Sequence, residues 1–120
     1  MITNRLVAAV TALLLATPAL AASPDPTGTW AANTAGCKIP QDRQGAPLII
    51  TATGYDQHES HCQFTSVRKS GSGGSKQVWQ TKSKCTVEGS TQNDAVLFER
   101  DGNRLILNRR NVSQILKRCA

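Results

Sequence analysis

Beyond residue 22, apolar and polar residues alternate over short runs, which is the spacing of strands. Residues 48–53 are apolar and β-branched and predict a strand that ends at Gly54. Residues 78–87 predict a longer strand, with apolar and small residues on one face and Lys82 and Lys84 on the other. No helical periodicity longer than about two turns follows the first 22 residues, so an all-β domain is expected.

The glycine-rich segment between two of these runs predicts a hairpin. A two-residue turn at residues 73–74 places Cys62 directly opposite Cys85 on one face. The same register sets Arg68 opposite Trp79. In a pair of residues without backbone hydrogen bonds between them, the two Cβ atoms approach to disulfide distance. Turn and register therefore both favour a Cys62–Cys85 bond.

A second hairpin is predicted nearer the C-terminus. Residues 94–100 and 104–108 read as strands, and the Asp-Gly pair at residues 101–102 is typical of a type I′ turn. In this register Phe98 faces Leu105. Both faces of the hairpin carry apolar residues, which suits a sheet that folds over on itself.

Together with a short last strand at residues 115–119, these elements predict an all-β fold. We expect a small antiparallel meander or barrel of six to eight short strands. Residues 1–22 read as a signal peptide, because a short apolar run follows Arg5, Pro18 breaks it, and small residues then offer a cleavage site. The run is shorter than the roughly 20 apolar residues of a membrane-spanning helix. Residues 23–120 are then a single exported domain, periplasmic or secreted, without a transmembrane segment.

The chain has four cysteines, an even number that fits two disulfides in an oxidising compartment. Three connectivities are possible on paper. The hairpin register favours Cys62 with Cys85, which leaves Cys37 for Cys119 and would tie the first loop to the last strand. Small cores supply only about 3–5 kcal/mol, so such covalent links are expected in a domain of this size.

The net charge is +6, with 14 Lys and Arg against 8 Asp and Glu, and loss of Arg5 with the leader lowers it by one. This charge attracts acidic partners without specifying one. We expect a monomer that binds an unknown protein or an anionic envelope component, and not nucleic acid. The basic residues of a possible anion-binding patch are Lys82, Lys84, Arg109, Arg110, Lys117 and Arg118.

The densest group of ligand-type residues lies at residues 56–62. Its two histidines, His58 and His61, are three apart, so on a strand they face opposite sides, and the spacing of a helical zinc motif is not met. The glycine-rich segment lacks phosphate-loop spacing, and no serine, cysteine or paired carboxylates form a catalytic motif. We therefore expect no metal, no cofactor and no enzymatic activity.

One set of residues runs through most of the chain after the leader: Gly28-Thr29-Trp30, Cys37, Tyr55, Glu59 to Phe64, Trp79, Cys85, Glu88-Gly89 and Arg118-Cys119. In these residues the chain resembles small exported four-cysteine proteins of alphaproteobacteria. The likeness covers most of residues 23–120 and implies a periplasmic β domain without assigning a function.

Two further likenesses suggest functions. Trp30 opening the first strand, with Arg118 on the last, resembles the barrel-closing pair of lipocalin-like proteins. The size also resembles that of periplasmic inhibitors of C-type lysozyme, although two basic proteins would repel each other. These likenesses imply a non-enzymatic binding or inhibitor-type protein, with a small lipocalin-like carrier of an apolar or anionic ligand as the alternative.

Overall fold

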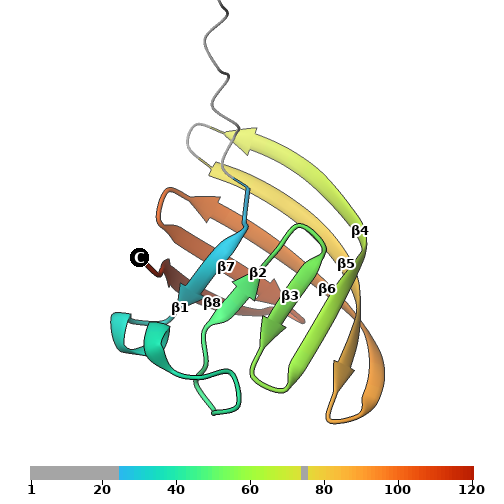
Figure 1. Ribbon diagram of the computed structural model, residues 1–120. Coiled ribbons are helices and arrows are strands. Elements are labelled where there is room, and N and C mark those ends of the chain that lie inside the picture. The colour runs from blue at the N-terminus through green and yellow to red at the C-terminus, as the bar shows by residue number, and fades with distance from the viewer. Residues whose placement is uncertain (1–24, 74–75) are drawn as a thin grey trace, which may run out of the picture.

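Each strand pairs with the next along the chain, and the first pairs with the last, so the sheet closes on itself (Figure 1). The computed structural model describes residues 25–73 and 76–120, and within them eight antiparallel strands form this barrel. The predicted all-β barrel is confirmed. The predicted signal peptide lies outside the described residues. The strands are β1 (Gly28–Ala31), β2 (Leu48–Ile50), β3 (Gly54–Gln57), β4 (Ser60–Gly73), β5 (Lys76–Val87), β6 (Ser90–Asp101), β7 (Arg104–Arg109) and β8 (Val112–Arg118).

The barrel closes between β1 and β8, where Trp30 lies opposite Arg118. The last strand is longer than predicted and ends before Cys119, whose backbone N–H donates to the Thr29 carbonyl at 2.8 Å. A 3₁₀ helix, η1 (Thr34–Lys38), follows β1 and carries Cys37. The disulfide between Cys37 and Cys119, with Cα atoms 5.7 Å apart, confirms the predicted end-to-end link.

The second disulfide crosses the long β4–β5 hairpin. Cys62 and Cys85 lie directly opposite each other with Cα atoms 4.0 Å apart, as the sequence predicts. Beyond Phe64 the register shifts by one residue, and Arg68 lies opposite Gln80. The predicted pairing of Arg68 with Trp79 is therefore wrong, because a β-bulge inserts an extra residue in β4. At the far end of the hairpin, residue 73 pairs with residue 76, so the turn is not at residues 73–74.

The hairpin of β6 and β7 is displaced from its predicted register by two positions. Its turn falls at residues 102–103, and Phe98 faces Leu107 rather than Leu105. Gly102 takes a φ of +61° at the first central position, where a type II′ turn requires glycine. A slip of two leaves every side chain on its original face, so hydrophobic patterning alone does not separate the two registers.

Strand β2 is shorter than predicted, because the chain turns at residues 51–53. The Thr51 N–H donates to the Gly54 carbonyl at 2.8 Å, and Gly54 begins β3 instead of ending β2. A Cβ on Gly54 would collide with the carbonyl oxygen of Cys62 on β4. Glycine is needed here for the close approach of β3 to β4.

The interior of the barrel is filled by side chains. The rings of Tyr55, Phe64 and Phe98 meet with centroids 5.8–6.5 Å apart. Trp30 and Leu105 are fully buried, and both cysteines of the β4–β5 disulfide belong to the same core. An eight-stranded barrel is just wide enough for such filling. No helix in the described part of the chain is long and apolar enough to span a bilayer.

Candidate functional site

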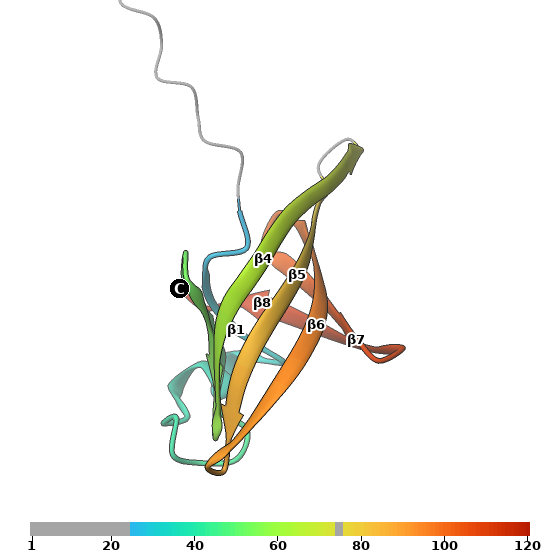
Figure 2. The ribbon, with the colours of Figure 1, turned by 90° about the vertical axis from the view of Figure 1, so that its right-hand side faces the viewer.

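Backbone pairing between strands β6 and β7 ends halfway along β6. Their pairing runs from Asp101 and Arg104 to Leu97 and Asn108, whereas β6 continues to Ser90 with β5 as its partner. The chain leaves β7 through the turn at residues 110–111 and returns as β8. This turn projects away from the lower half of β6, so the barrel wall opens as a wedge (Figure 2).

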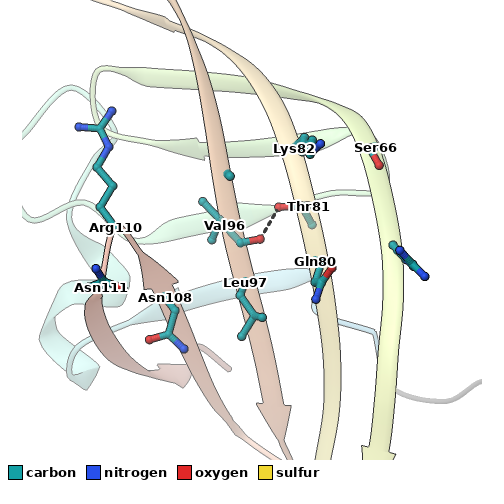
Figure 3. A pocket seen from close by; sticks show the side chains of 11 residues that line it. Ser66, Gln80, Thr81, Lys82, Val96, Leu97, Asn108, Arg110 and Asn111 are labelled. Carbon is teal, nitrogen blue, oxygen red and sulfur yellow. Dashed lines mark hydrogen bonds between the residues drawn. The ribbon is translucent and has the colours of Figure 1, made fainter.

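The outer side of this wedge is a groove of about 680 Å³. Its walls come from the outer faces of β4, β5 and β6 on one side and from β7 with its turn on the other (Figure 3). Thr81 and Val96 border the groove from buried positions, and the Thr81 hydroxyl donates to the Val96 carbonyl at 2.8 Å. The other lining residues are Ser66, Arg68, Gln80, Lys82, Ala95, Leu97, Asn108, Arg110 and Asn111.

The groove is strongly basic. Arg68, Lys82 and Arg110 are its charged lining residues, and Asp and Glu are missing from the described residues that line it. None of the three forms an ion pair with another residue in the described ranges. The remaining polar groups, three side-chain amides and two hydroxyls, can donate or accept hydrogen bonds. Unpaired cations with such neighbours form a site that favours an anion.

A polar network holds the two sides of the wedge together from within. The Asp94 carboxylate on β6 accepts from the Tyr55 hydroxyl and lies next to Arg109 Nε on β7, both at 2.9 Å. Arg109 Nη2 also donates to the Tyr55 oxygen at 3.4 Å. Burial and the hydrogen bond to Asp94 raise the pKa of Tyr55 above its ordinary value. The network spans the place where backbone pairing between β6 and β7 has ended.

The structure divides the predicted basic patch among several places. Lys82 and Arg110 line the groove, and Lys84 is exposed two residues along the same face of β5. Arg109 points inward to Asp94 instead. Lys117 and Arg118 border a different groove of about 410 Å³, which also includes Arg104.

Sequence reasoning missed Arg68 as a groove residue. The predicted register set Arg68 opposite Trp79, whose side chain is buried in the core. The bulge after Phe64 shifts β4 by one residue and moves Arg68 to the outer face, beside Gln80. Alternation within β4 alone gives no signal of an inserted residue, so only the paired structure reveals this cation.

Trp30 and Arg118, the predicted barrel-closing pair, lie opposite each other on β1 and β8. The arginine that covers the Trp30 ring is a different one, Arg100. Arg100 on β6 is buried with its guanidinium carbon 5.2 Å from the Trp30 ring centroid. Its Nε donates to the Gly102 carbonyl at 2.9 Å. Burial, together with the charge of Arg118 nearby, lowers the pKa of Arg100. Arg118 lies beside Gly28, at the edge of this end of the barrel.

The cluster of ligand-type residues at positions 56–62 disperses in the structure. His61 pairs with Asp56, and His58 Nδ1 lies 3.1 Å from the Gln41 carbonyl oxygen. Cys62 is in its disulfide. Across residues 25–73 and 76–120, no three His, Cys, Asp or Glu side chains form a group that could hold a metal ion.

Comparison with known proteins returns no relatives. No family model matches the chain, and no curated protein or solved structure matches it significantly.

Proposed function

We propose that this protein is an exported, non-enzymatic binding module that holds an anionic ligand in the groove between β4–β6 and the turn at residues 110–111. The observation that carries the proposal is the set of three unpaired cations, Arg68, Lys82 and Arg110, around a groove without a lining carboxylate. Long-range attraction from the positive net charge, which persists after loss of Arg5 with the leader, speeds the approach of such a ligand. Two disulfides fit an oxidising compartment and support export.

The chemistry of the lining residues supports binding rather than catalysis. The described residues around the groove include hydroxyls and amides but no His, Cys, Asp or Glu that could act as a base for Ser66. Lys82 lies opposite Ser66 and is the one lining amine that could act as a base, but no third side chain among the described lining residues is a carboxylate or imidazole that would orient it. The groove therefore offers more groups for recognition of an anion than partners for acid–base chemistry.

Two alternatives are less well supported. A lipocalin-like carrier would hold its ligand inside the barrel, where the rings of Tyr55, Phe64 and Phe98 already contact one another. An inhibitor of a basic lysozyme would have to overcome repulsion from the groove cations. A groove on the outer face avoids both difficulties, and it accommodates an acidic protein as readily as an anionic polymer.

The test is retention on a heparin column, a sulfated polymer that serves as a general polyanion probe. The variant Arg68→Gln, Lys82→Gln, Arg110→Gln removes the three groove cations. The matched control, Lys38→Gln, Arg104→Gln, Lys117→Gln, removes three charges elsewhere. We expect the groove variant to elute at markedly lower salt than the control, because local cations around a groove act together. Equal shifts for both variants would show that only net charge matters and would refute the proposal.

A further inference from the structure

Half of β6 presents an unpaired backbone edge beside the groove. Residues 90–96 pair with β5 on one side, and on the other side no strand of the described chain pairs with them. Residues 90–93 are exposed. Pairing with β5 is regular from Ser90 to Asp101, whereas the free part of β4 is interrupted by irregularities at Phe64/Ser66 and Lys69/Ser72. Bulges blunt an edge against further pairing, so the edge of β6 is the better template.

The hairpin turn fixes which backbone groups point to this open side. Residues that flank a two-residue turn exchange both backbone hydrogen bonds, so Asp101 and Arg104 form such a pair. Alternation along β6 then turns every second residue toward β7, and the same alternation turns Thr91, Asn93 and Ala95 toward the open side. The hydrogen bond from the Thr81 hydroxyl to the Val96 carbonyl supports this assignment, because it shows that the backbone carbonyl of Val96 points toward β5 and not toward the open side.

Some backbone groups on the open edge of β6 already have a hydrogen-bond partner, and others do not. The Ala95 N–H donates to Asp94 Oδ1 at 3.1 Å. For the N–H and C=O of Thr91 and Asn93, no partner is found within the described ranges on the open side. Exposed groups of this kind are ready to pair with an extended chain.

The charges beside the edge define what that chain must carry. On the outer face of β5, Lys82 lies opposite Ala95 and Lys84 opposite Asn93, so only short side chains separate these lysines from the edge. Arg110 borders the groove from the other wall. The nearby carboxylate of Asp94 faces inward and is engaged by Arg109. Side chains on the outer face of an added strand would therefore meet cations.

We propose that an extended acidic segment of a partner protein adds to β6 as an antiparallel strand, with carboxylates at alternate positions directed to Lys82, Lys84 and Arg110. The inference rests on the proposed function and names its ligand class. Main-chain hydrogen bonds to Thr91 and Asn93 supply affinity, and the alternating carboxylates supply specificity. A second copy of this chain is a poorer occupant, because edge-to-edge pairing would bring two rows of the same lysines together.

The test measures binding of a labelled peptide of alternating Thr and Glu, eight residues long and blocked at both ends. A second peptide replaces Glu with Gln, and a third is N-methylated at every second residue so that one edge cannot donate. We expect the Gln and N-methyl peptides each to bind about tenfold more weakly or worse, since the first loses the charge pairing and the second loses ladder hydrogen bonds. The N-methyl peptide tests the edge without altering the protein.

Variants of the protein complete the experiment. Asn93→Pro removes one N–H from the open edge, where proline is tolerated in a strand, and Asn93→Ala keeps it. We expect Asn93→Pro to weaken binding about tenfold and Asn93→Ala less than about twofold, with the Lys82→Gln, Lys84→Gln variant reducing its salt dependence. Circular dichroism checks the fold of each.

The outcomes separate the two proposals. Loss of binding in the lysine variant, with no effect of Asn93→Pro or of peptide N-methylation, would overturn strand addition and leave the anionic groove standing. If replacing the groove cations by glutamine changed neither heparin retention nor peptide binding, both proposals would be overturned. Concentration-dependent dimers in sedimentation, abolished by Asn93→Pro, would replace the acidic partner with a second copy of the chain.

Discussion

The two halves of β6 differ although they belong to one continuous strand. Residues 97–101 pair on both sides and carry the fully buried Phe98 into the core. Within the described chain, residues 90–96 pair with β5 only, and Ala95 and Val96 among them line the groove. The difference arises from strand length, since β6 has 12 residues and β7 has 6. A barrel built from unequal strands can therefore seal its core at one level and leave an open edge at another.

The largest expected effect breaks the closed half. Phe98→Ala removes a ring that contacts Tyr55 and Phe64, and we expect it to lower the free energy of unfolding by about 3–5 kcal/mol. Urea unfolding followed by tryptophan fluorescence measures the change. Asn93→Ala in the open half is the control, with an expected change within about 0.5 kcal/mol. Similar losses at both positions would contradict the contrast between the halves.

The next largest effect concerns the Cys37–Cys119 disulfide, which links η1 to the residue after β8. Replacing Cys37 and Cys119 by alanine removes a disulfide between residues 82 positions apart, and we expect a loss of about 2–5 kcal/mol. The groove lies on other elements, so heparin retention should stay unchanged in the folded variant. Thermal unfolding of the oxidised proteins checks the first expectation. A melting temperature equal to that of the parent would show that closure needs no covalent link.

A smaller effect concerns the network that spans the wedge. Asp94→Asn leaves Arg109 without its counter-ion, and we expect a loss of about 1 kcal/mol, because the Arg109 side chain is partly exposed to solvent. Asp42→Asn removes the same charge from an exposed loop position and serves as the control. A double-mutant cycle with Arg109→Gln isolates the pair. Additive losses in that cycle would mean that the two side chains do not support each other.

The smallest expected effect is a loss of stability at alkaline pH that is tied to ionisation of Tyr55. The pKa of Tyr55 is raised by burial and by its bond to Asp94, so the folded protein holds the phenolic proton longer than the unfolded chain does. The stability tied to this proton is complete below the unfolded pKa of 10.0 and is lost as pH rises toward the folded pKa. Tyr55 is the chain's single tyrosine, so absorbance titration reports it directly. Tyr55→Phe should remove this step from the stability profile. A titration midpoint at or below 10 would contradict the network.

Local patterning was enough to predict the two faces of β5 and its link to β4. Alternation in β5 identified its buried and exposed faces, and the facing cysteines identified the Cys62–Cys85 disulfide. The groove could not be predicted in the same way. It depends on the length of β7 relative to β6 and on the bulge that moves Arg68 outward, and neither leaves a periodic signal in one strand. Charged residues alone grouped Lys82 with Lys117, which the folded chain separates between two grooves.

The turn at residues 110–111 has a practical consequence for protein engineering. Arg110 and Asn111 both adopt left-handed backbone conformations, with φ of +50° and +64°. For an arginine this conformation costs about 1–2 kcal/mol, whereas glycine adopts it freely. Arg110→Gly would thus relax the backbone and at the same time remove a cation from the groove. If the groove binds an anion as proposed, a screen that rewards heat resistance would select this substitution at the expense of binding, so melting temperature alone is a misleading guide at this position.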